Sequence, residues 1–176
     1  MKETEVKILE INQQQIEELL VKLQAKKTFE GTIQTLFLDF KDGRIIKQGN
    51  LLRLRKDPEK TELTFKKVKH TQTVKIAEEY SVEVSNIETI VQILQNLGLN
   101  ITGSMEKHRI SYKLDNAQFD MDKYIGDYSF IPEFLEIEAE NIDKIYNYAQ
   151  MLGFKHKDCL PWSTEDLIGH YSKKLN

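Results

Sequence analysis

Three charged residues alternate near the start of the chain, in the run Glu3-Thr-Glu5-Val-Lys7. Side chains two residues apart on a β-strand point to the same face, so an extended run would place both carboxylates and the ammonium group together. Paired carboxylates suit a hard divalent cation such as Mg²⁺ or Mn²⁺, and a neighbouring lysine suits a phosphate group. The run therefore indicates metal-assisted chemistry on a phosphate-bearing ligand.

The same alternation recurs in later segments. The pattern predicts strands at 3–10, 35–40, 51–55, 62–66, 79–84, 107–112, 118–122 and 134–139. One face of these strands carries six bases: Lys7, Arg53, Arg55, Lys66, Lys107 and Arg109. The same face carries eight acids: Glu3, Glu5, Glu79, Glu83, Asp120, Asp122, Glu136 and Glu138. The opposite face is apolar and should be buried, including Tyr80 and Val82.

Three amphipathic helices should cover the apolar face. They follow the strands at 3–10, 79–84 and 134–139, and the sequence predicts N-caps at Asn12, Ser85 and Asn141. An open antiparallel sheet would leave the charged face in water. The concentration of arginines and carboxylates favours instead a closed barrel, because eight strands leave room inside for one small ligand. We therefore expect an α+β fold, an eight-stranded antiparallel β-barrel with a charged lumen and helices outside.

The charge inside such a barrel bears on its ligand. The eight acids outnumber the six bases, which leaves the lumen at −2. A bare polyphosphate of charge ~−4 would be repelled. Two divalent cations would reverse the sign of the lumen, so the composition predicts a dependence on Mg²⁺ or Mn²⁺.

Length and composition narrow the class of protein. The 176 residues suit one domain, 1–176, and the net charge of −3 argues against a nucleic-acid partner. Cys159 is the single cysteine, which excludes an internal disulfide. No apolar stretch approaches the ~18 residues that would span a membrane, and no signal-like segment opens the chain. We expect a cytoplasmic protein with neither a membrane nor a nucleic acid as partner.

The ordered set of charged motifs resembles the CYTH superfamily of triphosphate tunnel metalloenzymes, which includes class IV adenylate cyclase and thiamine triphosphatase. The opening run is similar to the Glu-x-Glu-x-Lys signature of that family. The later family motifs are an Arg-x-Arg strand, a strand lysine, a basic pair and two acidic strands. They are matched in order by Arg53 and Arg55, Lys66, Lys107 and Arg109, Asp120, and Glu136 with Glu138.

The resemblance implies a tunnel that binds a triphosphate end-on with one or two divalent metal ions. The implied metal ligands are Glu3, Glu5, Asp120, Glu136 and Glu138. The implied phosphate-binding residues are Lys7, Arg53, Arg55, Lys66, Lys107 and Arg109. Glu3, Glu5, Lys7 and Lys66 are the implied catalytic residues, and Glu79 with Glu83 would orient the bases.

Three functions fit these residues. In a hydrolase, water attacks the terminal phosphorus of tripolyphosphate, thiamine triphosphate or a nucleotide such as ATP. In a cyclase, the ribose 3′-hydroxyl of ATP attacks the α-phosphorus, and cyclic AMP and pyrophosphate form. A non-catalytic binder of polyphosphate or another anion is the third, which the eight inward carboxylates disfavour. We favour hydrolysis of a small-molecule triphosphate.

Two segments depart from the family pattern. Gly126 is followed by a longer stretch, 127–133, which we expect to form an extra loop near one mouth of the tunnel. The C-terminal region has Trp162 in place of the usual family segment, and we expect this tryptophan to pack rather than to bind a ligand.

Overall fold

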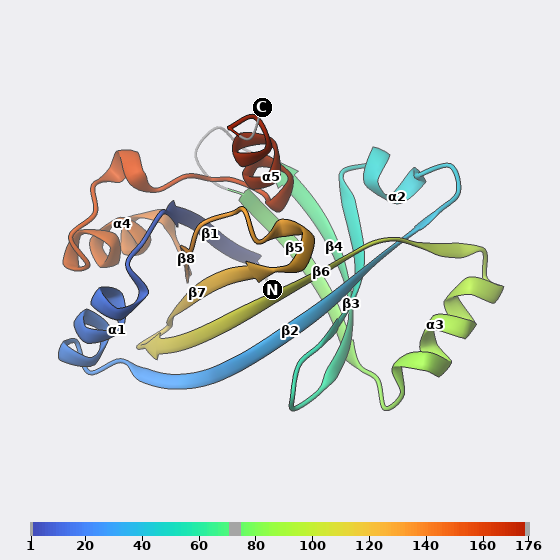
Figure 1. Cartoon of the computed structure of the whole chain (residues 1–176), viewed down its shortest axis with the longest axis horizontal. Coiled ribbons are helices and arrows are strands. Elements are labelled where there is room, and N and C mark those ends of the chain that lie inside the picture. The colour runs from blue at the N-terminus through green and yellow to red at the C-terminus, as the bar shows by residue number, and fades with distance from the viewer. Residues whose placement is uncertain (1, 71–74, 175–176) are drawn as a thin grey trace.

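Eight antiparallel strands close into a barrel in the computed structural model of the chain (Figure 1). The structure describes residues 2–70 and 75–174, without the side chains of residues 2–3, 68–70 and 75–77. The strands are β1 Lys2–Leu9, β2 Lys26–Phe40, β3 Asn50–Lys56, β4 Thr61–His70, β5 Lys75–Glu83, β6 Leu99–Leu114, β7 Ala117–Ile125 and β8 Phe134–Ala139. They are ordered β1-β5-β4-β3-β2-β6-β7-β8, and β1 closes the barrel by pairing with both β5 and β8. The predicted fold class is confirmed.

The helices lie outside the barrel. They are α1 Gln13–Lys22, α2 Arg44–Lys47, α3 Ile87–Asn96, α4 Ile142–Met151 and α5 Thr164–Ser172, with short 3-10 turns at Gly126–Tyr128 and His156–Asp158. In Figure 1, α1 and α4 lie on one side of the barrel and α3 on the other. Within the described ranges, no helix has the length and apolar character needed to cross a membrane.

Two of the three predicted helix caps are confirmed. The side chains of Asn12 and Asn141 each accept a hydrogen bond of 3.0 Å from a backbone N–H three residues later. The predicted cap at Ser85 was wrong, because Asn86 caps α3 and accepts from the Thr89 N–H at 2.7 Å. Serine and asparagine are comparable N-caps, so spacing alone could not separate the two neighbours.

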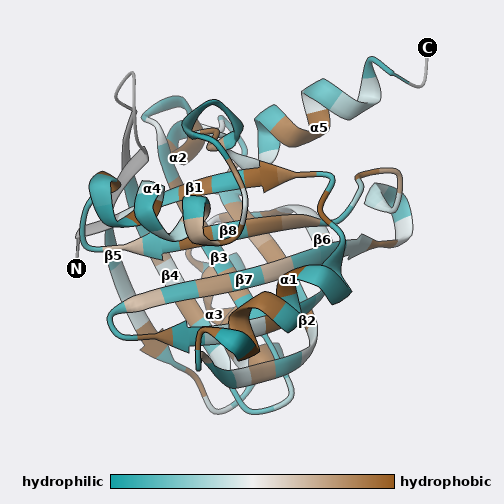
Figure 2. Ribbon diagram, turned by 90° about the vertical axis from the view of Figure 1, so that its left-hand side faces the viewer, coloured by the Kyte–Doolittle hydropathy of each residue, from teal (hydrophilic) through white to brown (hydrophobic). Residues whose placement is uncertain are grey.

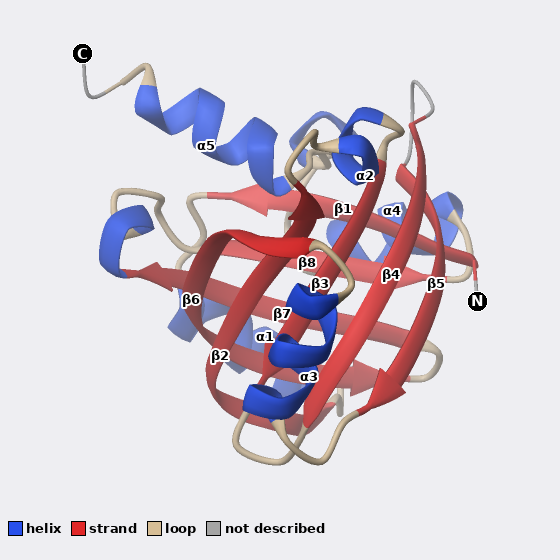
Figure 3. Ribbon diagram, turned by 90° about the vertical axis from the view of Figure 1, so that its right-hand side faces the viewer, coloured by secondary structure: helices blue, strands red, loops and turns tan. Residues whose placement is uncertain are grey.

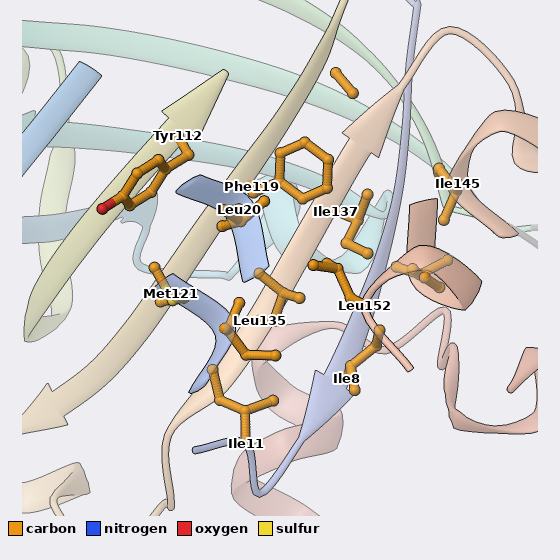
Figure 4. Close-up of a cluster of buried hydrophobic side chains, with 14 of the residues drawn as sticks. Ile8, Ile11, Leu20, Tyr112, Phe119, Met121, Leu135, Ile137, Ile145 and Leu152 are labelled. Carbon is orange, nitrogen blue, oxygen red and sulfur yellow. The ribbon is translucent and has the colours of Figure 1, made fainter. Parts of the chain in front are cut away.

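The largest apolar core lies between the barrel wall and the pair α1 and α4. Figure 4 shows side chains from β1, β6, β7 and β8 meeting those of the two helices. Phe119 is fully buried there, and its ring is nearly perpendicular to that of Tyr148, with the centroids 5.4 Å apart. The alternation of apolar and polar residues along the strands, visible in Figure 2, sends one set outward into this core and the other into the lumen.

A second apolar cluster joins α3 to the barrel wall and includes Leu38, Leu54, Leu94 and Leu99. Figure 3 shows α3 lying against the outside of this wall. This coverage does not extend to the end of β5, because Tyr80 and Val82 are 59% and 57% exposed. The prediction that these two side chains are buried was wrong. Alternation along a strand assigns a face, but it does not determine whether a helix reaches that face.

A third cluster joins α5 to the stretch after Gly126. Ile131 is fully buried against Leu167 and Tyr171, and Trp162 packs at the edge of this group. The packing role predicted for Trp162 is confirmed. The 127–133 loop therefore serves as a platform on which α5 is held over one end of the barrel.

Replacing Phe119 by alanine should lower the free energy of unfolding by about 3–5 kcal/mol, because the cavity left in the core cannot collapse fully. Urea unfolding followed by circular dichroism would measure the change. Tyr80→Ala is the matched control, and we expect it to change the free energy of unfolding by less than about 0.5 kcal/mol because Tyr80 is exposed. A larger effect for Tyr80→Ala than for Phe119→Ala would contradict this description of the core.

Candidate functional site

A cavity of about 420 Å³ occupies the inside of the barrel. All six bases assigned to the inner face line it: Lys7, Arg53, Arg55, Lys66, Lys107 and Arg109. Five of the assigned acids also line it: Glu5, Glu79, Asp120, Glu136 and Glu138. Glu3 lies on β1 opposite Ala77, but its side chain is outside the described part of the structure. The remaining two differ, since Asp122 is buried in the wall and Glu83 is exposed.

Arg109 is the centre of a buried charge network in the barrel wall. Its Nε donates to Asp122 at 2.7 Å, a terminal nitrogen donates to Glu136 at 2.6 Å, and the other terminal nitrogen pairs with Asp120. Burial opposes the charge on Arg109, but the carboxylates of Asp122, Asp120 and Glu136 outweigh it and raise the pKa of the guanidinium. These bonds follow from the β6–β7 register, which sets Arg109 directly opposite Asp122.

The seam between β1 and β8 brings further charges together. Their register sets Lys7 opposite Glu136 and Glu5 opposite Glu138. Lys7 Nζ lies 2.8 Å from Glu136 and 3.6 Å from Glu5. Burial opposes the charge of Glu136, yet Lys7, Lys107 and Arg109 hold the pKa of this carboxyl well below its usual range. The carboxylate of Glu136 therefore ties the seam to the Arg109 network.

The depressed pKa of Glu136 predicts a loss of stability in acid. Its carboxylate stabilises the folded state fully above the ordinary glutamate pKa of about 4.3, and this contribution disappears as the pH falls toward the lower folded-state value. Urea unfolding between pH 3 and pH 7 should show a free energy that falls with acidity. Glu136→Gln should flatten that fall, and parallel curves for the two proteins would contradict the prediction.

Arg53 and Arg55 differ from Arg109 because buried nitrogens remain unpaired. The Nε atoms of both are buried and reach no acceptor within the described part of the chain. Burial, together with Arg55 and Arg109, lowers the pKa of Arg53 to about 9, and burial with Arg109 lowers the pKa of Arg55. At a pKa of about 9, Arg53 stays charged at neutral pH. Two mutually repelling guanidinium groups with unused donors favour an anion in the cavity.

The remaining bases are paired. Lys66 forms an ion pair with Glu79, its register partner on β5, and Arg53 reaches Glu79 only at 3.7 Å. Lys107 donates to Asp122 at 2.6 Å, while burial and Arg109 lower the pKa of Lys107. Asp122 therefore neutralises two bases from within the wall.

The acids offer a donor set for a hard cation. Glu5 and Glu138 both line the cavity and lie directly opposite on β1 and β8, with Lys7 Nζ 3.6 Å from Glu5. Like charges directly opposite on neighbouring strands repel, so a further cation beside them is favourable. Carboxylate oxygens are the ligands that Mg²⁺ and Mn²⁺ prefer. Among the side chains that the structure describes, which do not include that of Glu3, no group of three or more His, Cys, Asp or Glu is arranged to hold a metal ion. The chemistry of the donors fits a divalent metal ion.

Several lining residues were not predicted. Tyr124 lines the cavity from β7, in the same alternating series as Asp120 and Asp122, so this pattern could have identified it. Burial raises the pKa of Tyr124 to about 12, and its hydroxyl is hydrogen bonded to Thr164. Thr164 and Glu165 reach the cavity from helix α5. The alternation of residues along strands therefore could not predict them.

The whole arrangement has relatives of known structure. The family model of the CYTH domain matches residues 1–149. A conserved hypothetical protein from Pyrococcus furiosus superposes with a TM-score of 0.76 at 24% identity, covering 94% of this chain and 99% of that one. A candidate adenylate cyclase from Vibrio parahaemolyticus gives a TM-score of 0.79 at 14% identity, covering 95% and 97%.

A candidate adenylyl cyclase from Hippeastrum with a dominant triphosphatase activity gives a TM-score of 0.64 at 14% identity, covering 87% of this chain and 88% of that one. No curated protein sequence matches this chain significantly. At these identities the solved structures establish the fold alone.

Proposed function

The chain belongs to the CYTH family, and from this membership and the lumen geometry we propose that it hydrolyses a triphosphate-bearing small molecule with the help of a divalent metal ion. One observation carries the proposal. The cavity combines two buried arginines with unused donors, Arg53 and Arg55, and two carboxylates directly opposite one another, Glu5 and Glu138. An anion with several phosphates complements the two arginines, and a hard cation complements the two carboxylates.

The bases of the lumen would bind the phosphate chain. Arg53 and Arg55 lie on β3, and Lys66 on β4 adjoins them, so three cations face the cavity from neighbouring strands. Lys7 and Lys107 contribute from β1 and β6. Arg109 is held by three carboxylates, so its part is to fix the acids in place as well as to present positive charge.

Glu5 and Glu138, with Glu3, Glu136 and Asp120, would hold the metal ion. A bound divalent ion would neutralise phosphate charge and make water more acidic. In the hydrolysis, the oxygen of a water molecule attacks the terminal phosphorus and the bond from that phosphorus to the bridging oxygen breaks. The bridging oxygen stays on the diphosphate product, orthophosphate is released, and the proton of the water passes to a lumen carboxylate and then to solvent. Lys7 and Lys66 would stabilise the negative charge on the two products.

Product analysis tests the proposal. The purified protein is incubated with ATP, thiamine triphosphate or tripolyphosphate, each with Mg²⁺, Mn²⁺ or EDTA. We expect metal-dependent release of orthophosphate, with the fastest substrate identifying the physiological class. Cyclic AMP and pyrophosphate from ATP would overturn hydrolysis in favour of cyclisation. Absence of turnover with all three substrates would overturn the enzymatic assignment.

A further inference from the structure

The cavity of the barrel has two chemically different ends, and the two strands that flank β2 change character in the same order between them. Along β3, Leu51, Arg53 and Arg55 line it in turn. Along β6, Met105, Lys107 and Arg109 do the same. Four residues of a strand cover roughly 13 Å, so each series runs from an apolar residue at one end to an arginine at the other over that length.

Each end of the cavity adjoins a different space. A neighbouring cavity of about 380 Å³ shares the residues Phe37, Leu51, Met105 and Glu165 with the lumen. We call this end the apolar mouth, since its other walls include Phe40, Ile45, Leu52 and Ile168. A smaller cavity of about 250 Å³ shares the residues Arg55, Lys60, Glu62, Arg109 and Gln118 with the lumen, and we call this end the basic mouth.

The two mouths lie at opposite ends of the barrel. The apolar mouth is bordered by α2, and the basic mouth by the turn between β3 and β4, and Figures 1 and 3 place these two elements at opposite ends. The basic mouth reaches the surface, because the side chains of Thr28, Glu59 and Lys113 on its rim are exposed. The lumen is therefore a passage with two openings of different chemistry.

This polarity orients a substrate. An apolar pocket suits the organic part of a ligand, whereas the terminal phosphate would extend past Arg53 toward Arg55. Orthophosphate cleaved from that end would be trapped behind the diphosphate product if the apolar mouth were the only way out. The lumen of an eight-stranded barrel is too narrow for one product to pass the other.

We propose that orthophosphate leaves through the basic mouth, before the diphosphate product leaves. We further propose that Lys60 is the positioning residue that binds orthophosphate there. This inference rests on the proposed hydrolysis. The bonds formed and broken are those of the proposed hydrolysis, and the inference concerns only the path by which orthophosphate leaves.

Lys60 is held at the rim by a rigid turn. The Asp57 carboxylate accepts hydrogen bonds from the backbone N–H groups of Glu59 and Lys60 at 2.8 and 2.9 Å. On the other side the turn presses against β2, where a Cβ on Gly31 would lie only 3.0 Å from the Pro58 ring. Lys60 Nζ lies 2.9 Å from Glu62, in a side chain that is 45% exposed. An ammonium group fixed between lumen and solvent is suited to passing on a small anion.

Blocking each mouth in turn tests the route. A cysteine is introduced at Glu59 on the rim of the basic mouth, at Lys41 beside the apolar mouth, or at Met151 on α4 as a control, and each is labelled with a bulky maleimide. Cys159 is buried, and labelling of the unaltered protein checks that it does not react. Orthophosphate release is then followed under single-turnover and steady-state conditions.

We expect the label at Glu59→Cys to lower steady-state kcat about tenfold or more while leaving the single-turnover cleavage rate unchanged. The label at Lys41→Cys should instead raise KM, and the label at Met151→Cys should do neither. Unchanged steady-state turnover with the basic mouth blocked would overturn the route. A lower kcat with the label at Lys41→Cys, together with a higher KM with the label at Glu59→Cys, would overturn the route as well. Hydrolysis by the unlabelled protein reports separately on the proposed function.

Lys60→Ala provides a second test. It should weaken inhibition by added orthophosphate about tenfold while changing KM for the substrate little, because Lys60 lies beyond the cleaved end. Lys67→Ala is the matched control, an exposed lysine on the next strand that lines none of the three cavities. Equal inhibition of all three proteins by orthophosphate would exclude a role for Lys60.

Discussion

Arg109→Met is expected to lower the free energy of unfolding by about 3–5 kcal/mol, as much as the loss of the Phe119 ring from the apolar core. The substitution leaves Asp120, Asp122 and Glu136 close together in a buried wall without the guanidinium that neutralises them. A domain of this size is stable by about 5–15 kcal/mol in total, so the variant should be close to unfolding at ambient temperature. Urea unfolding and the thermal midpoint would both report the change.

Lys144→Met is the control for this prediction. Lys144 pairs with Glu140 at 2.6 Å on the surface, and exposed pairs of this kind contribute less than about 1 kcal/mol. Adding Asp122→Asn to Arg109→Met should recover part of the lost stability, because one uncompensated carboxylate is removed. Equal stability of Arg109→Met and the unaltered protein would show that the network does not hold the wall together.

Glu138→Gln is expected to lower kcat/KM by about 100-fold or more and to weaken the binding of Mn²⁺, while the fold survives. Glu138 faces Glu5 across the seam and lines the cavity, but it is not part of the apolar core. The amide keeps the shape of the side chain and removes the negative charge that a divalent cation requires. Steady-state kinetics at increasing Mg²⁺, and titration with Mn²⁺ in the absence of substrate, would measure the two effects separately.

Glu140→Gln is the matched control, because Glu140 follows the same strand but is exposed and pairs with Lys144. It should keep both activity and Mn²⁺ affinity. Full turnover of Glu138→Gln at saturating Mg²⁺ or Mn²⁺ would remove Glu138 from the metal site. Retained Mn²⁺ affinity with lost turnover would instead assign Glu138 to the chemistry and the metal to the other carboxylates.

The alternation of charged and apolar residues predicted the barrel because each strand has one face inside and one outside. It located all eight strands, yet it shortened β2 and β6 severely, since only 35–40 and 107–112 carried the pattern while the strands extend over Lys26–Phe40 and Leu99–Leu114. The missed part of β2, 26–34, pairs with the predicted part of β6, and the missed part of β6, 99–106, pairs with the predicted part of β2. Each is therefore kept extended by its partner strand, which the alternation of its own residues does not reveal.

The same reasoning identified most of the charged residues that line the lumen, but it could not predict which of them form ion pairs with one another. Parity placed Asp122 beside Asp120, although Asp122 is buried between Lys107 and Arg109 and only Asp120 lines the cavity. Residues that reach the site from outside the sheet, Thr164 and Glu165, had no periodic signal. Pairing and depth depend on strand register and on barrel tilt, which a one-dimensional pattern does not contain.

The position of β1 between β5 and β8 has a consequence for synthesis of the protein. Within the barrel this strand is made before the other seven, but its partner β8 at Phe134–Ala139 is made more than a hundred residues later. Until then the side of β1 that pairs with β8 is an open edge, a state that invites aggregation. Glu3, Glu5 and Lys7 alternate along it, and charges in such a position discourage pairing with a wrong strand. Glu5 and Lys7, which line the finished cavity, thereby also protect the nascent chain.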